Sequence, residues 1–457
     1  MTTVAVLGGG FAGMLAAAAL SWKADEILVV EEDQLPDHPQ PRKGVPQGHH
    51  SHMLMGGGAD ALESMLPGIL DEIYAAGGFR RGMPEGMLTL SAAGWHRRHD
   101  GPAYVVMCSR PLLDQLIRRR VTARPGVTVL TGVKVTGLTG SAARVNGFRT
   151  EGGASPVIEA DLIVDATGRR SKAPEWLAEL GLTLPPDAVV DPGMAYATRL
   201  YDVPEGVGDD FPAVLIQPEV ATGRPGRGAT LFPIEGRRWI VTMCGTRGGE
   251  PPSDDEGYRE FASGMRHPMI AKLIAGAEPI GGARPYRGTA NRRRHFERLA
   301  MPDGFVAVGD AVAAMNPVYA HGMSVAALGV RVLAAEVASR GFTDGLAAAA
   351  QAGIAGVTEM PWAMASGQDL GFPGVTTNLT PEPPDPEMTA VHQRMGVLAL
   401  TEPPVANAVF GMYTLSLAAD RMVTPEVAEA LQNGAGRPPL DADEAIAQFP
   451  VVEKLLS

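Results

Sequence analysis

The chain of 457 residues is poor in cysteine, in positive charge and in long hydrophobic runs. Its only two cysteines, Cys108 and Cys244, show no Cys-x-x-Cys spacing, which argues against a disulfide scaffold and a cysteine-based metal site. The 39 Lys and Arg residues are outnumbered by 51 Asp and Glu, so that the net charge is −12. A chain of this charge offers no basic footprint for nucleic acid. We therefore expect no nucleic-acid partner, and from the scarcity of cysteine we expect a cytoplasmic location.

Signals for membrane insertion or secretion are also missing. No stretch of about eighteen uninterrupted apolar residues occurs, and we expect no transmembrane segment. The apolar N-terminal stretch has no basic region before it and is interrupted by glycines, unlike a signal peptide. The length exceeds that of one ordinary domain and favours two or three.

A glycine-rich motif near the N-terminus is the strongest local signal. It consists of Gly8, Gly9, Gly10, Phe11, Ala12 and Gly13. It follows an apolar run at residues 4–7 and opens an alanine-rich stretch, as expected of a turn between a buried strand and a helix. Gly8 allows the tight turn, Gly10 lets a pyrophosphate approach the backbone, and Gly13 lets helix and strand pack closely. Glu31 ends the next apolar run and can accept a hydrogen bond from a ribose, so the motif predicts a dinucleotide site.

The distribution of apolar residues predicts an α/β fold. The segments at residues 161–166 and 305–308 are typical of buried parallel strands, like the run at 4–7. Between about 190 and 290 the runs alternate instead, which favours an antiparallel or mixed sheet inserted into the dinucleotide-binding domain. Residues 342–457 are mostly alanine-rich and predict a helical C-terminal region.

A second motif lies almost three hundred residues after the first. Gly309-Asp310 ends an apolar run, and Pro317 and His321-Gly322-Met323 then open a helix. Together with the glycine motif, this resembles the flavoprotein monooxygenases related to para-hydroxybenzoate hydroxylase and squalene epoxidase. The resemblance implies FAD as the cofactor, with Asp310 on its ribityl chain. It also implies that the turn from Pro317 to Gly322 and Met323 aims a helix N-terminus at the flavin, where backbone N–H groups stabilise negative charge.

Three further positions match this family. Arg110 stands where the family has a helix-heading arginine that contacts FAD, and Val135 where the backbone holds the adenine. Arg42 lies in a loop where the family places an arginine near the ribose or pyrophosphate. The resemblance implies a discontinuous Rossmann-like FAD-binding domain over residues 1–78, 104–185 and 287–341. A substrate-binding domain would then cover 79–103 and 186–286, with the helical region over 342–457.

The loop that begins at Arg42 narrows the resemblance to one branch of this family. Its Arg-Lys-Gly-Val-Pro-Gln sequence, with histidines at 49, 50 and 52, resembles the monensin- and lasalocid-type polyether epoxidases. This implies an FAD-dependent monooxygenase that inserts one oxygen atom of O2 through a flavin C4a-hydroperoxide. The substrate would be an alkene of an apolar polyene, polyketide or prenyl chain in secondary metabolism. Epoxidation needs no substrate deprotonation, whereas the alternative, a phenol or quinone hydroxylase, needs a base or a hydrogen-bond chain. An FAD-dependent prenyl-chain reductase is a third hypothesis.

The electron source stays open. Thr167 stands where the aromatic hydroxylases have an aspartate that serves both FAD and NAD(P)H, and a second glycine fingerprint is absent. We therefore expect either transient NAD(P)H binding or a partner flavin reductase.

Candidates for catalysis are His321, Gln47 and His49. The resemblance implies that His321 lies beside the flavin turn. For Gln47 and the histidines at 49, 50 and 52, we expect that one of them lines the edge of the flavin, and hydrogen bonds that order the loop are the alternative. The histidines lack an acidic partner at ligand spacing, and we expect no metal site. The alternating middle region offers five candidates for an apolar substrate pocket: Met194, Tyr196, Leu215, Phe232 and Met243. Low aromatic content (5%) and 21 methionines suit a deformable apolar pocket.

Overall fold

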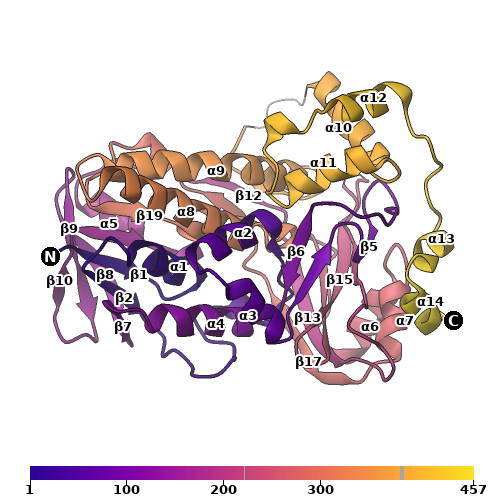
Figure 1. Cartoon of the computed structure of the whole chain (residues 1–457), viewed down its shortest axis with the longest axis horizontal. Coiled ribbons are helices and arrows are strands. Elements are labelled where there is room, and N and C mark those ends of the chain that lie inside the picture. The colour runs from indigo at the N-terminus through magenta and orange to yellow at the C-terminus, as the bar shows by residue number, and fades with distance from the viewer. Residues whose placement is uncertain (221, 381–384) are drawn as a thin grey trace.

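The computed structural model describes residues 1–220, 222–380 and 385–457 (Figure 1). A five-stranded parallel sheet forms the centre of its first part, in the order β19-β11-β1-β2-β7. The strands are β1 (Thr3–Leu7), β2 (Glu26–Glu31), β7 (Val127–Thr131), β11 (Leu162–Asp165) and β19 (Phe305–Ala307). Residues such as Val4 and Val6 are fully buried, because a parallel sheet is covered on both faces.

Helices far apart in the sequence cover this sheet. α1 (Phe11–Leu20) packs against α8 (Gly322–Arg340), and α8 in turn packs against α9 (Leu346–Asp369) (Figure 1). The remaining helices of this part are α2 (Gly56–Met65), α3 (Ile69–Ala75), α4 (Arg110–Thr122) and α5 (Ala173–Glu179). Within the described residues, α8 alone is long and apolar enough to cross a membrane, but it packs against α1, α2 and α9 as a core helix does. A small antiparallel sheet of β8 (Lys134–Gly140), β9 (Val145–Glu151) and β10 (Val157–Glu159) lies beside β2.

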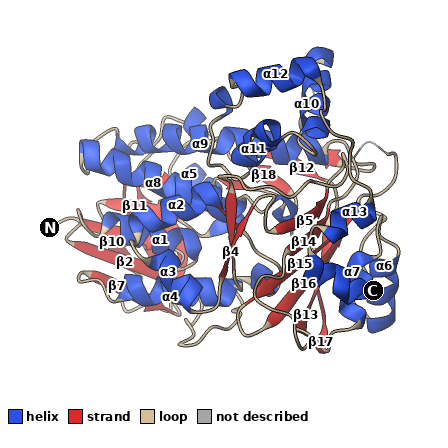
Figure 2. Ribbon diagram, turned by 45° about the vertical axis from the view of Figure 1, so that its right-hand side comes forward, coloured by secondary structure: helices blue, strands red, loops and turns tan. Residues whose placement is uncertain are grey.

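The second part is built on a six-stranded mixed sheet in the order β17-β13-β16-β15-β14-β5. Its strands are β5 (Met87–Leu90), β13 (Ala195–Asp202), β14 (Ala213–Ile216), β15 (Arg227–Ile234), β16 (Arg238–Gly245) and β17 (Pro279–Tyr286). Only the β5–β14 pair is parallel. One face of the sheet is covered by α6 (Asp255–Ser263) and α7 (Met269–Ala275) (Figure 2).

Two small sheets and the C-terminal helices complete the molecule. One sheet contains β3 (Leu54–Met55), β4 (Phe79–Gly82) and β6 (Tyr104–Met107); the other contains β12 (Ala188–Asp191), β18 (Asn291–Arg293), β20 (Ala313–Ala314) and β21 (Thr376–Thr377). The last helices are α10 (Pro386–Leu398), α11 (Pro403–Tyr413), α12 (Pro425–Asn433), α13 (Ala442–Ala447) and α14 (Pro450–Leu456). The predicted α/β fold class, with its inserted mixed sheet and helical C-terminal region, is confirmed.

The predicted domain boundaries stay a prediction, and α9 shows why the last one is not sharp. Its residues Leu346, Ala350 and Ile354 belong to the same apolar core as the parallel sheet. α13 and α14, by contrast, contribute to the core of the mixed sheet. The helical C-terminal region is therefore shared between the two sheets.

Candidate functional site

The glycine motif forms a tight turn at the carboxyl end of β1. Gly8 has φ +101°, and a Cβ added there would lie 2.6 Å from the carbonyl oxygen of Ala166. At Gly13 an added Cβ would lie 1.8 Å from the carbonyl oxygen of Gly8. Both positions therefore require glycine. Phe11 and Ala12 begin α1, whose N-terminus has no side-chain cap, and its N–H groups remain available to an anion.

The side chains of Glu31 and Arg42 contact each other next to this turn. The Glu31 carboxylate accepts a hydrogen bond of 2.7 Å from the backbone N–H of Gly9 and forms a 2.9 Å ion pair with Arg42. Arg42 also lies 3.3 Å from Asp33. The guanidinium comes within 3.7 Å of the position that a Cβ would take at Gly10. Thus Gly10, Glu31 and Arg42, predicted separately from the sequence, lie together.

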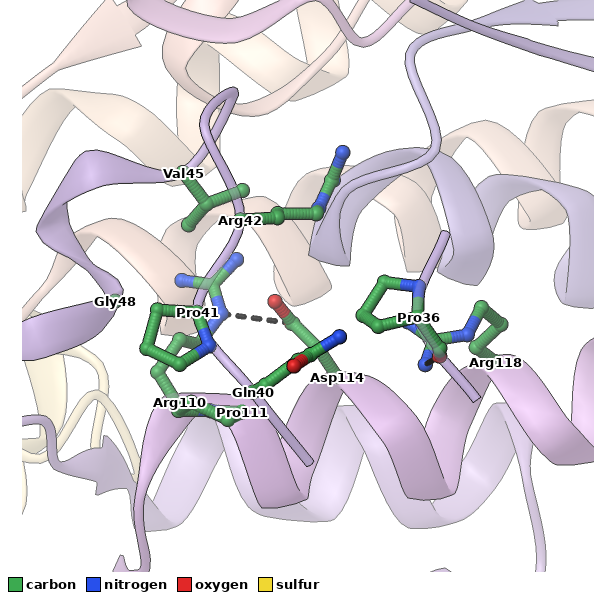
Figure 3. Close-up of a pocket in the computed structure, with 10 residues that line it drawn as sticks. All are labelled: Pro36, Gln40, Pro41, Arg42, Val45, Gly48, Arg110, Pro111, Asp114 and Arg118. Carbon is green, nitrogen blue, oxygen red and sulfur yellow. Dashed lines mark hydrogen bonds and ion pairs between the residues drawn. The ribbon is translucent and has the colours of Figure 1, made fainter. Parts of the chain in front are cut away.

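A small pocket next to Arg42 contains a second arginine. Arg110 begins α4, with Ser109 as its N-cap, and its Nε donates to Asp114 over 2.7 Å (Figure 3). The pocket is lined by Pro36, Gln40, Pro41, Arg42, Val45, Gly48, Arg110, Pro111, Asp114 and Arg118. Three of these side chains are cationic and one is anionic, so the pocket favours an anionic group such as a phosphate.

Asp310 lies at the carboxyl end of β19. Its carboxylate has no hydrogen-bond partner in the ranges 1–220, 222–380 and 385–457. Burial raises the pKa of this carboxyl group, while the positive charges of Arg169, Arg110 and Arg294 act in the opposite direction. A Cβ added at Gly322 would lie 3.5 Å from its Oδ1, so the first turn of α8 passes close by. A carboxylate left without a donor is suited to a ligand that carries hydroxyl groups.

The turn over residues 317–322 connects Asp310 to α8. Pro317 is exposed although Asn316 before it is fully buried, and Met323 follows in the first turn of the helix. No side chain caps α8, which leaves its first N–H groups available. These features reproduce at α8 what the glycine motif provides at α1: a free helix N-terminus at the edge of the parallel sheet.

His321 is the N-cap residue of α8. Its ring is 1% exposed, and its Nε2 lies 2.9 Å from the carbonyl oxygen of Tyr413 at the end of α11. Burial lowers the pKa of His321 to about 4, so the ring is neutral at pH 7. The structure thus places this candidate against the C-terminal helices, where it anchors α8 to α11.

Val135 and Thr167 flank the turn. Val135 lies in β8 close to β2, and the backbone N–H of the neighbouring Val133 donates to the carbonyl oxygen of Glu31. Thr167 donates its hydroxyl proton to Asp165 over 2.6 Å. The hydroxyl of Thr167 is therefore used within its own turn.

A cavity of about 610 Å³ opens between the loop after Arg42 and β17. It is lined by Gln40, Pro41, Arg42, Lys43, Pro46, His49, His50, Ala283, Arg284, Pro285 and Tyr286. His49 is therefore a wall residue of the cavity, whereas Gln47 lies in the adjoining turn of Pro46–His49 and is not in the lining. Burial and Arg284 both lower the pKa of His49.

The face of the mixed sheet that points away from α6 and α7 carries most of the predicted pocket residues. Tyr196 lies on it and contacts Met194, while Leu215 and Phe232 pack there against β3, β6 and the C-terminal helices. Met243 does not share this face with the other four predicted pocket residues. Its neighbours in the sheet are Ala197 and Ala229, and because side chains alternate along a strand it packs on the opposite face, toward α6 and α7.

The same face of the sheet holds a chain of hydrogen bonds that the sequence did not reveal. Nδ1 of His50 lies 2.7 Å from Oγ1 of Thr198, which lies 2.7 Å from Oγ1 of Thr242. Thr242 continues to Oγ of Ser51 over 2.8 Å, and Thr230 donates to Ser51 over 3.3 Å. β13, β15 and β16 each contribute one threonine, and only the pairing of these strands shows that the three converge.

His50 connects this chain to the cavity. Its ring lies 5.2 Å from that of Tyr286, another wall residue. Burial and the neighbouring His52 and His49 lower the pKa of His50 to about 3, so the imidazole is neutral at pH 7 and has one donor and one acceptor nitrogen. Among the residues that the structure describes, no group of three or more His, Cys, Asp and Glu side chains is arranged to hold a metal ion.

Comparisons with known proteins agree on the family. The model of the family described as FAD binding domain matches residues 1–341. Protein Rv3254 of Mycobacterium tuberculosis (strain ATCC 25618 / H37Rv) is 30% identical over 427 residues, which cover 90% of this chain and 89% of that protein. The 6-methylpretetramide 4-monooxygenase of Streptomyces rimosus is 34% identical over 179 residues, 37% of this chain and 39% of that enzyme.

Solved structures share the fold. The flavin-dependent brominase Bmp2 superposes with a TM-score of 0.68 at 15% identity, covering 94% of this chain and 98% of that one. The chain therefore belongs to the FAD-binding-domain family and is an FAD-dependent monooxygenase with the fold of para-hydroxybenzoate hydroxylase.

Proposed function

We propose that FAD lies across the carboxyl edge of the parallel sheet, from the glycine turn to the 317–322 turn. Four observations support this: the absent Cβ atoms at Gly8 and Gly13, the cationic pocket of Arg42 and Arg110, the carboxylate of Asp310 beside Gly322, and the N-termini of α1 and α8, which no side chain in the described part of the chain caps. In this placement the helix N-termini face the pyrophosphate and the flavin, and Asp310 accepts from the ribityl hydroxyls. Once reduced, bound FAD would supply the electrons that activate O2 for the insertion of one oxygen atom into a small molecule.

We further propose that the substrate is a phenol and that the reaction is its hydroxylation. The observation that carries this is the chain from His50 through Thr198 and Thr242 to Ser51. A phenol becomes more reactive toward an electrophilic oxygen when it loses its proton, which then needs a path to solvent. Neutral His50 and the hydroxyl groups can each accept one proton and donate another, and the chain ends at the wall of the open cavity.

Epoxidation of a polyene stays a prediction that nothing in the structure tests. It needs no proton path, and the chain of hydroxyl groups would have no part in it. The relative from Streptomyces rimosus is by its name a monooxygenase of 6-methylpretetramide, and its similarity agrees with oxygen insertion without deciding between the two reactions. NAD(P)H or a partner flavin reductase remains the expected electron source. The cytoplasm remains the expected compartment, since Cys108 and Cys244 are both free.

The experiment compares three probes under 18O2. The FAD-loaded protein is given NADH, NADPH or an added flavin reductase, together with 1-naphthol, its methyl ether or geranylgeraniol. Mass spectrometry then reads the oxygen content of each product. We expect 1-naphthol to gain one 18O atom and its methyl ether to gain none, because only the phenol can be deprotonated.

Two results contradict the proposal in different ways. An 18O epoxide from geranylgeraniol, with both naphthalenes unchanged, would favour the epoxidase. Saturation of geranylgeraniol without isotope uptake would favour the prenyl-chain reductase.

A further inference from the structure

A buried carboxylate lies behind the 317–322 turn. Asp369, the last residue of α9, is fully buried. Its Oδ1 accepts a 2.6 Å hydrogen bond from the hydroxyl of Tyr319, and its Oδ2 accepts from Nδ2 of Asn291 over 2.6 Å and Nδ2 of Asn316 over 2.9 Å. In the described part of the chain, no Lys, Arg or His side chain forms an ion pair with it. Burial raises the pKa of Asp369, while the hydrogen bonds from Tyr319, Asn316 and Asn291 act in the opposite direction, so these three neutral donors stabilise its ionised form.

Backbone groups fix the direction of these hydrogen bonds. The N–H of Asn316 donates to Oδ1 of Asn291, and the N–H of Val318 donates to Oδ1 of Asn316. Since backbone N–H groups can only donate, both amide oxygens are identified and both NH2 groups must face Asp369. Oδ2 of Asp369 is therefore an acceptor, and the hydroxyl of Tyr319 completes the coordination of the ionised form.

The network reaches the substrate face of the mixed sheet. Oδ1 of Asn316 also accepts a 2.8 Å hydrogen bond from the hydroxyl of Tyr196 on β13. Asp369 consequently joins four elements: α9, β18 through Asn291, the 317–322 turn through Tyr319, and β13 through Asn316 and Tyr196. Pro317 lies between Asn316 and Tyr319, both of which donate to the carboxylate.

We infer that Asp369 is a positioning residue that fixes the 317–322 turn against the sheet and, through its negative charge, lowers the reduction potential of FAD at this turn. The inference rests on the placement of FAD proposed above. A buried negative charge opposes the gain of electrons nearby, because little water screens it. It acts against the N-terminus of α8, which favours a reduced, negatively charged flavin.

The test measures the midpoint potential of bound FAD at pH 8 in the wild type and two variants. In Asp369→Asn the amide oxygen stays toward the two asparagines, the NH2 group faces Tyr319, and the charge is lost. We expect a more positive midpoint potential. The ratio of the dissociation constants of oxidised and reduced FAD should change tenfold, which corresponds to a shift of about 30 mV for two electrons. In Tyr319→Phe the charge stays but loses one donor, and we expect a more negative potential.

The opposite signs separate charge from simple distortion. Unchanged potentials, or shifts in the same direction, would overturn the inference. If Asp369→Asn does not fold, Tyr319→Phe decides alone: a negative shift supports the inference and an unchanged potential overturns it. A wild-type protein that takes up no FAD would contradict both the placement and this inference. A protein that shows the two shifts but does not oxygenate phenols would contradict only the proposed reaction.

Discussion

Nδ1 of His50 lies 2.7 Å from Oγ1 of Thr198, although 148 positions separate the two residues in the sequence. His50 belongs to the loop that follows the first β–α–β unit, and Thr198 lies in the middle of β13. The contact therefore links the cofactor-binding part to the substrate-facing sheet. It is also the first step of the hydroxyl chain on which the proposed reaction depends.

Replacement of Thr198 by valine interrupts this chain without changing the shape of the side chain. We expect kcat for phenol hydroxylation to fall about 100-fold or more, the usual contribution of a positioned proton acceptor. The FAD dissociation constant should stay the same. Thr89→Val is the matched control, since Thr89 is buried in the same sheet but is not in the chain. Equal activity of the two variants in steady-state kinetics would contradict the role of Thr198.

Asp310→Asn should weaken FAD binding by about 10- to 100-fold, because a hydrogen bond to a charged group contributes about 1.5–3 kcal/mol. Burial raises the pKa of Asp310. FAD affinity of the wild type should consequently fall as the pH is lowered through that pKa, while the variant lacks this dependence. Flavin fluorescence titrations at several pH values check both points. The exposed Asp202→Asn variant should bind FAD like the wild type.

Gly13→Ala should abolish FAD binding. The added methyl group meets the carbonyl oxygen of Gly8 at 1.8 Å, and neither backbone segment can move without opening the turn. We expect a loss of about 1–3 kcal/mol in unfolding free energy, as for other overpacked sites. Gly356→Ala, in α9 with no atom within 4 Å of the new Cβ, should instead keep FAD binding and gain up to about 1 kcal/mol. Urea unfolding and FAD titration distinguish the two variants.

Acid should destabilise the protein partly through its buried histidines. Burial lowers the pKa of both His96 and His321 to about 4, below the ordinary value of 6.5. Between pH 6.5 and 4 the unfolded chain binds protons at these rings and the folded chain does not. The free energy of unfolding therefore decreases as the pH is lowered, by up to about 1.4 kcal/mol per pH unit for each ring. His96→Leu should reduce the slope of unfolding free energy against pH. A slope unaffected by His96→Leu would refute the assignment.

The parallel sheet and its glycine turn could be predicted because their signals are local. Gly8, Gly13 and Glu31 lie within one strand–helix–strand unit, and their spacing alone defines the turn. Asp310 and Gly322 could be placed near it only through the resemblance to a known family. The structure supplies the physical reason, since both lie at the carboxyl edge of the same sheet.

The substrate side could be predicted only in part, since it depends on strand pairing. Met243 and Thr242 are neighbours in sequence, yet they point to opposite faces of β16, and no local pattern selects the face. The buried position of Asp369 could not be predicted from the sequence, because an acidic residue near a helix end is ordinarily exposed. The hydrogen bond of His321 to Tyr413 could not be predicted either, because only the folded C-terminal region determines the position of Tyr413.

The most direct test of the proposed function is the ionisation of a phenol bound to the oxidised, FAD-loaded protein. Absorption spectra of bound 1-naphthol, recorded against pH without turnover, give its apparent pKa. We predict that this pKa lies below that of free 1-naphthol in the wild type and returns toward the free value in Thr198→Val. A bound phenol with the same pKa in both proteins, or a protein that binds geranylgeraniol and no phenol, would contradict the proposal.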